Sequence, residues 1–155
     1  MSDVPTYEVI LTDAPDIQAK TAIGEGLAAY NVQHANVDDR RDLAVLLRDT
    51  RTGEILGGIL GRTSLGLLFI DLVFIPEAMR RDGLGSRMLQ MAEEEGRARG
   101  CVNAVLYTIS FQAPEFYAKH GWHEFGRVEC HPPGTSRVFM TKGLGSGRPN
   151  SGPNP

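Results

Sequence analysis

Residues 65–89 read LGLLFIDLVFIPEAMRRDGLGSRML: an almost continuous apolar run, an arginine-led turn with two spaced glycines, and the start of an amphipathic segment. The apolar run at 65–76 is typical of a central strand that is buried on both faces. Residues 84–100 repeat apolar side chains at helical spacing, so a helix should follow the turn. The stretch therefore predicts a strand, a glycine-rich turn and a helix, which together begin a parallel crossover.

The helix expected at 84–100 combines an apolar stripe with a charged face. Its apolar side chains should pack in the core: Leu84, Met88, Leu89, Met91 and Ala92. Its charged side chains should form a solvated face: Glu93, Glu94, Glu95, Arg97 and Arg99. Gly100 is a suitable residue to end the helix.

The rest of the chain has the patterning of further strands and helices. Alternating or β-rich segments predict strands at 7–13, 42–49, 55–64, 102–109, 123–129 and 136–142. Helical spacing and a proline near each start predict helices at 14–31 and 111–122, with a polar loop at 32–41. Antiparallel strands come first and a parallel crossover follows, so the expected class is α/β (α+β mixed), a mixed sheet with helices on its faces.

Composition suits one globular domain, because the chain has 155 residues of which 41% are hydrophobic. The formal net charge of −3 argues against nucleic acid as a partner. Cys101 and Cys130 lack the spacing of a metal site and are expected to be free thiols. With no signal peptide or apolar run of membrane-spanning length, we expect a cytoplasmic protein without membrane contact. The domain should span 1–144, and the Gly/Pro-rich residues 145–155 should form a disordered tail.

The turn between strand and helix has the chemistry of an anion cradle. The first amides of a helix are unpaired and lie at the positive end of its dipole. Gly83 and Gly85 would let the backbone approach a ligand closely, and Ser86 could offer a hydroxyl. Arg80 and Arg81 could add charge-assisted hydrogen bonds. The alternative is an ordinary turn in which the glycines serve geometry and the arginines serve solubility.

Two nucleotide-binding motifs are excluded at this turn. A P-loop requires a lysine that the turn lacks. A dinucleotide fingerprint requires a small third residue, and Met88 stands there instead. The fingerprint also normally follows the first strand of a parallel unit, whereas this turn lies in the middle of the chain.

Asp71 interrupts the apolar strand, and a lone acid in such a strand is costly unless its charge is satisfied. One interpretation places it at a strand bulge or tip, bonded to backbone amides. The other makes it a general base. The sequence alone leaves both open.

The pattern that remains for the turn is [Q/R]-x-x-G-x-[G/A], carried by Arg80, Gly83 and Gly85. With it, the chain resembles the GNAT family of N-acetyltransferases, in which this motif binds the pyrophosphate of acetyl-CoA. The segment QAPEFYAKHGWHEFG extends the resemblance to the family pattern A-x-x-F-Y-x-x-x-G-[FWY], matched here by Ala113, Phe116, Tyr117, Gly121 and Trp122. The resemblance covers roughly residues 5–144. It implies a mostly antiparallel, twisted sheet of six to seven strands, about four helices and a splayed pair of central parallel strands.

The resemblance also implies where acetyl-CoA would bind. Its pantetheine arm would pair with the backbone of Leu72, Val73, Phe74 and Ile75, at a bulge in the strand. The pyrophosphate would contact Arg80 and the amides of Arg81, Asp82, Gly83, Leu84, Gly85 and Ser86. Ser110 stands where many relatives have a cofactor-contacting asparagine, and Ala113 belongs to the same site.

Acyl transfer from a thioester to an amine requires removal of a proton from the amine and return of one to the thiolate. By resemblance, Tyr117 is the general acid, although a core tyrosine with a bonded hydroxyl is the alternative. Asp71, acting through a water, or bulk water would be the base. Tyr30, Asn31 and His34, expected in the loop after the first helix, would contact the acceptor.

The resulting expectation is an acetyl-CoA-dependent N-acetyltransferase that acts on a primary amine of a small molecule, by direct attack in a ternary complex. A protein or peptide N-acetyltransferase and a non-catalytic acyl-CoA-binding module remain as alternatives. The two C-terminal strands could also pair across a homodimer.

Overall fold

The computed structural model describes residues 3–145, and the predicted disordered tail at 146–155 lies outside these residues. The chain divides into two compact units, residues 1–38 and 39–155. The predicted domain boundary at 144 stays a prediction. Among residues 3–145, no helix is both long and apolar enough to cross a membrane.

The first unit contains one long helix, α1 (Ile17–Ala35). The side chain of Asp16 caps its start by accepting a hydrogen bond from the Ala19 amide at 2.7 Å. Asn36 ends it in the left-handed conformation (φ 57°), and its amide donates to the Val32 carbonyl at 2.8 Å. The helix therefore continues through residues 32–35, the first part of the segment that the sequence predicts as a loop.

The strand predicted at 7–13 is wrong, because this segment forms neither helix nor strand. Its alternating side chains are exposed, with Val9 at 91% and Leu11 at 99% of their full accessibility. Alternation gives a segment the side-chain pattern of a strand, but a strand also needs a partner for its backbone hydrogen bonds. The described structure gives this segment no such partner.

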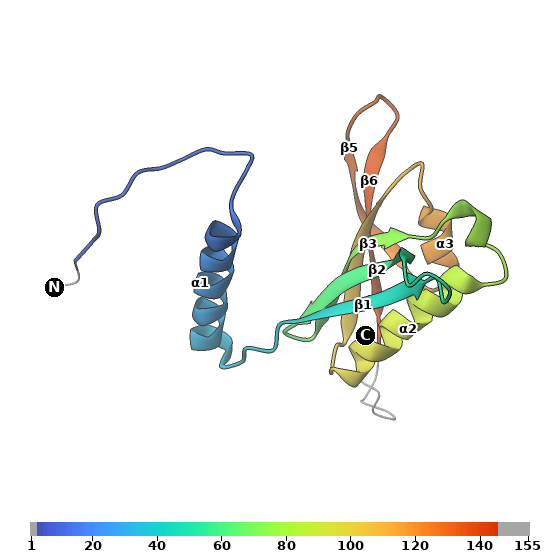
Figure 1. Ribbon diagram of the computed structural model, residues 1–155, viewed down its shortest axis with the longest axis horizontal. Coiled ribbons are helices and arrows are strands. Elements are labelled where there is room, and N and C mark those ends of the chain that lie inside the picture. Colours follow the sequence, from blue (N-terminus) through green and yellow to red (C-terminus); the bar gives the residue numbers. More distant parts are fainter. Residues whose placement is uncertain (1–2, 146–155) are drawn as a thin grey trace. The chain divides into compact units, whose positions relative to one another are not determined.

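The second unit is built on one six-stranded sheet (Figure 1). Its strands are β1 (Arg41–Arg48), β2 (Ile55–Ser64), β3 (Leu67–Phe74), β4 (Asn103–Ile109), β5 (His123–Glu129) and β6 (Ser136–Gly143). They lie in the order β1-β2-β3-β4-β6-β5, and only β3 and β4 pair in parallel. The mixed and mostly antiparallel sheet expected from the sequence is confirmed.

The parallel pair at the centre of the sheet separates part of the way along. β3 and β4 pair from Leu67 and Asn103 only as far as Ile70 and Leu106. Both strands continue beyond that point, β3 along β2 and β4 along β6. At the same level Leu72 pairs with Leu60 and Ile70 with Gly61, so Asp71 is an extra residue in a β-bulge. The strands therefore splay as expected, with the bulge at the separation.

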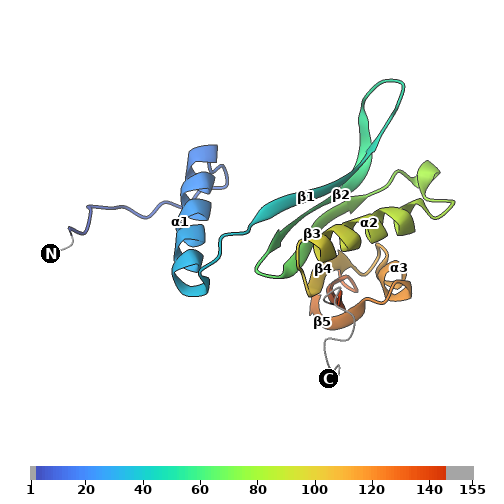
Figure 2. The same cartoon turned by 90° about the horizontal axis from the view of Figure 1, so that it is seen from below.

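Helix α2 (Leu84–Ala98) lies along the sheet and contacts β1, β2 and β3 (Figure 2). Three of its five predicted core residues, Met88, Leu89 and Ala92, are buried among the strands. Leu84 packs against this core while partly exposed, and Met91 is 48% exposed. The other helices of this unit are α3 (Pro114–Lys119) and a 3-10 turn, η1 (Glu77–Met79). Residues 3–145 thus hold three α-helices and one 3-10 turn, against about four helices expected.

Candidate active site

A cavity of about 490 Å³ lies at the opening of the splayed strands. The end of β3, the turn before α2, the end of β4 and helix α3 all line it. Its lining residues are Val73, Phe74, Ile75, Arg80, Gly83, Gly85, Ser86, Thr108, Phe111, Gln112, Ala113, Phe116 and Tyr117. The volume and the apolar wall with few polar groups are typical of a small-molecule site.

The turn at one end of the cavity has backbone amides available for an anion. Asp82 and Gly83 both adopt left-handed conformations, with φ of 64° and 73°. Gly83 is the N-cap of α2 and has no side chain that could bind the first amides of the helix. The amides of Leu84, Gly85 and Ser86 therefore have no side-chain cap, and they lie at the positive end of the helix dipole.

The side chains of Ile75 and Phe116 lie close to the backbone of this turn at Gly85. A Cβ atom added to Gly85 would lie 3.3 Å from Ile75 Cδ1 and 3.4 Å from Phe116 Cζ. Arg80 is folded back, because its Nε donates to the Ile75 carbonyl at 2.7 Å. A glycine at 85 thus keeps the cradle open, and Arg80 ties the end of β3 to the turn.

The structure brings together most, but not all, of the residues that the resemblance assigns to the cofactor. Eight of them line the cavity: Val73, Phe74, Ile75, Arg80, Gly83, Gly85, Ser86 and Ala113. Leu72, Arg81, Asp82, Leu84 and Ser110 do not line it. The Ser110 hydroxyl instead accepts from the Ser136 amide at 3.0 Å, so it holds the ends of β4 and β6 together.

Tyr117 of α3 lines the same cavity and is buried to 7% exposure. Its ring meets Phe116 and Trp122 edge to face, with centroid separations of 5.2 and 6.1 Å. Burial raises the pKa of the Tyr117 phenol above its ordinary value of 10.0. The phenol is therefore neutral at physiological pH and has a proton to donate.

Asp71 is held by an arginine of the neighbouring strand. Its Oδ1 accepts from Arg62 Nη1 at 2.6 Å, and both side chains are partly exposed. The Arg62 guanidinium also lies over the Phe69 ring, 4.3 Å from its centroid. Asp71 does not line the cavity. Its position in the bulge agrees with the first interpretation of this acid, but the partner that the structure gives it is the Arg62 guanidinium rather than a backbone amide. Its role as a base stays a prediction.

The three residues predicted to contact the acceptor lie in the first unit, on α1 rather than in a loop. That part of the prediction is wrong, because Asn36 ends the helix later than expected. Tyr30 and His34 are one helical turn apart and their ring centroids are 4.3 Å from each other. Contact of Tyr30, Asn31 and His34 with an acceptor stays a prediction.

Sequence reasoning missed four cavity residues: Thr108, Phe111, Gln112 and Phe116. Phe116 stands in the quoted family pattern, which could have indicated it. Gln112 is fixed by two hydrogen bonds that its Oε1 accepts, from the Thr108 hydroxyl at 3.1 Å and the Ile109 amide at 3.0 Å. These contacts depend on how the chain turns after β4, for which the sequence carries no local signal.

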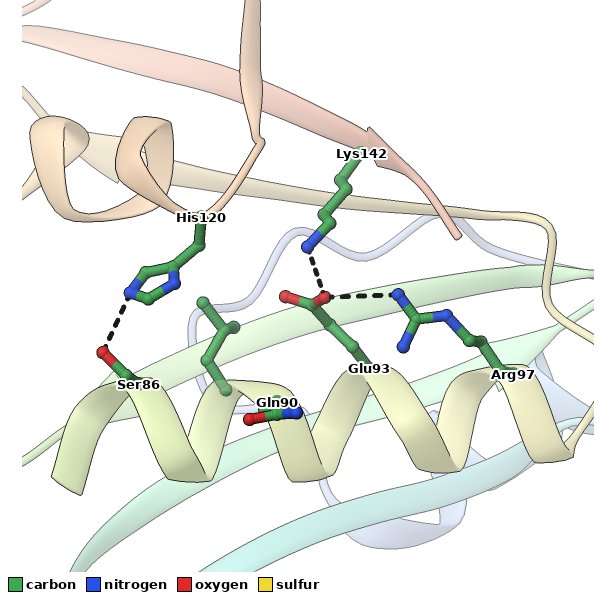
Figure 3. A pocket seen from close by; sticks show the side chains of 7 residues that line it. Ser86, Gln90, Glu93, Arg97, His120 and Lys142 are labelled. Atoms are coloured by element: carbon green, nitrogen blue, oxygen red, sulfur yellow. Dashed lines mark hydrogen bonds and ion pairs between the residues drawn. The ribbon is translucent and has the colours of Figure 1, made fainter. Parts of the chain in front are cut away.

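A second cavity, of about 240 Å³, lies between α2, α3 and β6 (Figure 3). Glu93 is at its centre and is 4% exposed, so the prediction that it belongs to a solvated face is wrong. Its carboxylate accepts from Lys142 Nζ at 2.6 Å and from the Trp122 indole at 3.2 Å, with Arg97 3.6 Å away. These partners satisfy the buried charge. Helical spacing places Arg97 beside Glu93, but it could not reveal the distant Trp122 and Lys142.

Comparisons with known proteins agree with this geometry. The Acetyltransferase (GNAT) family model matches residues 12–122. Acetyltransferase Atu2258 of Agrobacterium fabrum is 36% identical over 133 residues, which cover 86% of this chain and 96% of that protein. Blasticidin-S acetyltransferase of Streptomyces morookaense is 34% identical over 93 residues, or 59% of this chain and 68% of that protein.

Solved structures show the same fold. An acetyltransferase from Bacillus cereus is 31% identical, with a TM-score of 0.69 over 86% of this chain and 97% of that one. A chain from Agrobacterium tumefaciens is 35% identical, with a TM-score of 0.79 over 88% of this chain and 99% of that one. The family match over most of the chain, the splayed parallel strands and the cradle at the start of α2 agree, and the chain belongs to the GNAT family of acetyltransferases.

Proposed function

We propose that this acetyltransferase moves an acetyl group from acetyl-CoA to a primary amine of a small molecule, by direct attack within a ternary complex. One observation carries the proposal: a single cavity extends from the gap between β3 and β4 to the uncapped start of α2, with the Tyr117 side chain in its wall. Such a cavity suits a ligand that is elongated, largely apolar at one end and anionic at the other.

The residues present fit the cofactor. Beyond Ile70, β3 has no hydrogen-bonded partner in β4, so backbone groups near Val73 and Phe74 can pair with an amide-containing arm. The open cradle at Gly83 and Gly85 and the free first amides of α2 suit a pyrophosphate. Acetyl-CoA would supply an activated acetyl group as a thioester.

Tyr117 is the general acid in this proposal. A departing thiolate, with a pKa near 8.5 by analogy with cysteine, needs a proton from a neighbouring donor. Because burial raises its pKa, the Tyr117 phenol stays protonated over the pH range in which an amine acceptor begins to lose its own proton. The buried ring is also fixed by its aromatic neighbours, which keeps the donor in one place.

The acceptor amine must lose a proton, and two routes remain in the proposal. Asp71 could take it through a water, or solvent could take it directly. The ion pair of Asp71 with Arg62 favours solvent, since the carboxylate already has a cationic partner at 2.6 Å. Equal activity of Asp71→Asn and wild type across neutral pH would support solvent.

A small-molecule acceptor is favoured by the similarity to a blasticidin-S acetyltransferase, although that similarity covers only part of the chain. We place the reaction in the cytoplasm, where the two free thiols, Cys101 and Cys130, would remain reduced. Two results would replace this proposal: acetylation of a protein acceptor, or binding of acyl-CoA without turnover.

The first test is thermal unfolding with acetyl-CoA and CoA, with NAD and ATP as controls. A ligand at 100 times its Kd should add about 2.7 kcal/mol to the free energy of unfolding. Selective stabilisation by the CoA species, and its loss in Gly83→Glu, would support the site. Tyr117→Phe should then lower kcat at least tenfold and leave the Kd of acetyl-CoA unchanged. Failure of every amine tested, free or peptide-borne, to accept acetyl would favour a binding module.

A further inference from the structure

Ser86 is shared between the two cavities of the second unit, because its side chain lines both. On one side it belongs to the first turn of α2, where an anion would bind. On the other side its Oγ lies 2.9 Å from Nε2 of His120, the residue that ends α3 (Figure 3). Both side chains are partly buried. The hydroxyl of the cradle is therefore joined to a titratable ring.

Aromatic and charged side chains from three elements surround the His120 ring. The ring meets the Phe116 ring edge to face at 4.8 Å. Charged groups reach the same cavity from α2, as Glu93 and Arg97, and from β6, as Lys142. Glu93 is already paired with both cations. On its own helix, His120 follows the exposed Lys119 and the neutral phenol of Tyr117.

The direction of the Ser86–His120 hydrogen bond decides what Ser86 can offer an anion. A hydroxyl has one proton to donate and two lone pairs. When Nε2 of His120 carries no proton, the Ser86 hydroxyl donates to it and presents only lone pairs to a phosphate oxygen. When Nε2 carries a proton, it donates to Ser86 Oγ, and the hydroxyl proton is free to bind the phosphate.

We propose that His120 is a proton-linked positioning residue for the phosphate cradle: it binds Ser86 and, when protonated, turns the Ser86 hydroxyl toward the pyrophosphate of the cofactor. This inference rests on the proposed acetyl-CoA site. The imidazolium always carries the Nε2 proton and also adds a positive charge near the anion. Binding of the pyrophosphate is therefore coupled to uptake of a proton by His120, and affinity falls as pH rises.

Calorimetric titration of the full chain tests this coupling. The ligand is dephospho-CoA, which keeps the pyrophosphate but lacks the phosphomonoester, a group whose own ionisation near pH 6 would add a second pH dependence. Titrations at pH 5.5, 6.5 and 7.5, each in two buffers of different ionisation enthalpy, give the Kd and the number of protons taken up. From pH 5.5 to 7.5 the wild-type Kd should rise about three- to tenfold more than that of His120→Gln.

Two further variants make the result specific. Ser86→Ala should lose the same excess pH dependence, because the ring then has no hydroxyl to turn. His123→Gln, which changes an exposed histidine of β5, should keep the wild-type dependence.

Three outcomes would overturn the inference. Equal slopes of Kd against pH in wild type and His120→Gln would do so while leaving the cofactor site intact. Loss of the slope in His123→Gln would place the coupling elsewhere. Absence of any binding of dephospho-CoA or CoA would overturn the proposed function as well.

Discussion

Replacement of Glu93 by glutamine should destabilise the fold by an amount that its surroundings allow us to estimate. Removing one partner of a fully buried ion pair costs about 3–5 kcal/mol, because the other charge is left without compensation. Here the Glu93 side chain is 5% exposed, whereas Lys142 is 21% and Arg97 33% exposed, so both cations can reach water. The Trp122 indole keeps an acceptor, since the amide oxygen of glutamine can replace the carboxylate oxygen.

We therefore expect Glu93→Gln to lower the free energy of unfolding by about 2–3 kcal/mol, below the range for a fully buried pair. Urea unfolding followed by the fluorescence of Trp122, the one tryptophan of the chain, measures it directly. Glu94→Gln is the matched control, because it makes the same change on the same helix at an exposed residue. The Glu94 carboxylate accepts one hydrogen bond from the Gln90 side chain, at 3.3 Å, among the residues that the structure describes. The control should stay within about 0.5 kcal/mol of wild type.

A second substitution separates the lost pair from a general packing defect. In Glu93→Gln combined with Lys142→Met, the uncompensated ammonium is gone, so the double variant should recover part of the stability lost in Glu93→Gln. A loss below about 0.5 kcal/mol in Glu93→Gln, or equal losses in Glu93→Gln and Glu94→Gln, would refute the reasoning that this charge is held by its buried partners.

Three further predictions follow from other contacts. Gly85→Val should abolish the thermal stabilisation by CoA. The Cβ atom of the new side chain would lie 3.3 Å from Ile75 Cδ1, and its two methyl groups would fill the cradle. An undiminished rise in Tm with CoA would contradict this prediction. Arg62→Gln should cost no more than about 1 kcal/mol in urea unfolding, because the Asp71 pair is partly exposed; a loss above 2 kcal/mol would show a larger structural role. Burial raises the pKa of Tyr117, so its contribution to stability is complete below about pH 10 and is lost as pH rises through the higher folded-state value. The Tm of Tyr117→Phe should therefore fall less than the Tm of wild type between pH 9 and 11. Parallel curves of Tm against pH for the two proteins would contradict this prediction.

The strand–turn–helix stretch could be predicted from sequence because local forces decide it. A continuous apolar run, glycines in left-handed conformations and a stripe at helical spacing all lie within 65–100. The segments for which the sequence-based prediction is wrong depend on distant partners. The 7–13 segment has the alternation of a strand, but pairing needs a second backbone. Glu93 borders the apolar stripe, and its burial depends on Trp122 and Lys142, which lie far along the chain.

The residues of the candidate site also differ in whether local sequence patterns predict them. The turn, Tyr117 and the end of β3 follow from two short motifs whose residues are close in sequence. The Ser86–His120 pair comes from the meeting of α2 and the end of α3, 34 residues apart in the chain, which no local pattern encodes. The bonds of Gln112 lie within the turn after β4, whose conformation the sequence pattern did not predict. The polar segment 32–41 predicts a loop at His34, whereas the left-handed cap that ends α1 comes only at Asn36.

The turn motif at 80–85 and the motif at 113–122 are connected through α2. This connection explains why an aromatic residue follows the glycine at 121. Trp122 is 2% exposed, and its indole donates to Glu93, in the middle of α2. Ser86, two helical turns earlier on the same side of α2, contacts His120. The segment after α3 thus holds α2 at two points, one at the cradle and one in the core. A helix held in this way cannot slide or rotate without breaking a buried hydrogen bond, so its first amides stay aimed at the cavity that Tyr117 also lines.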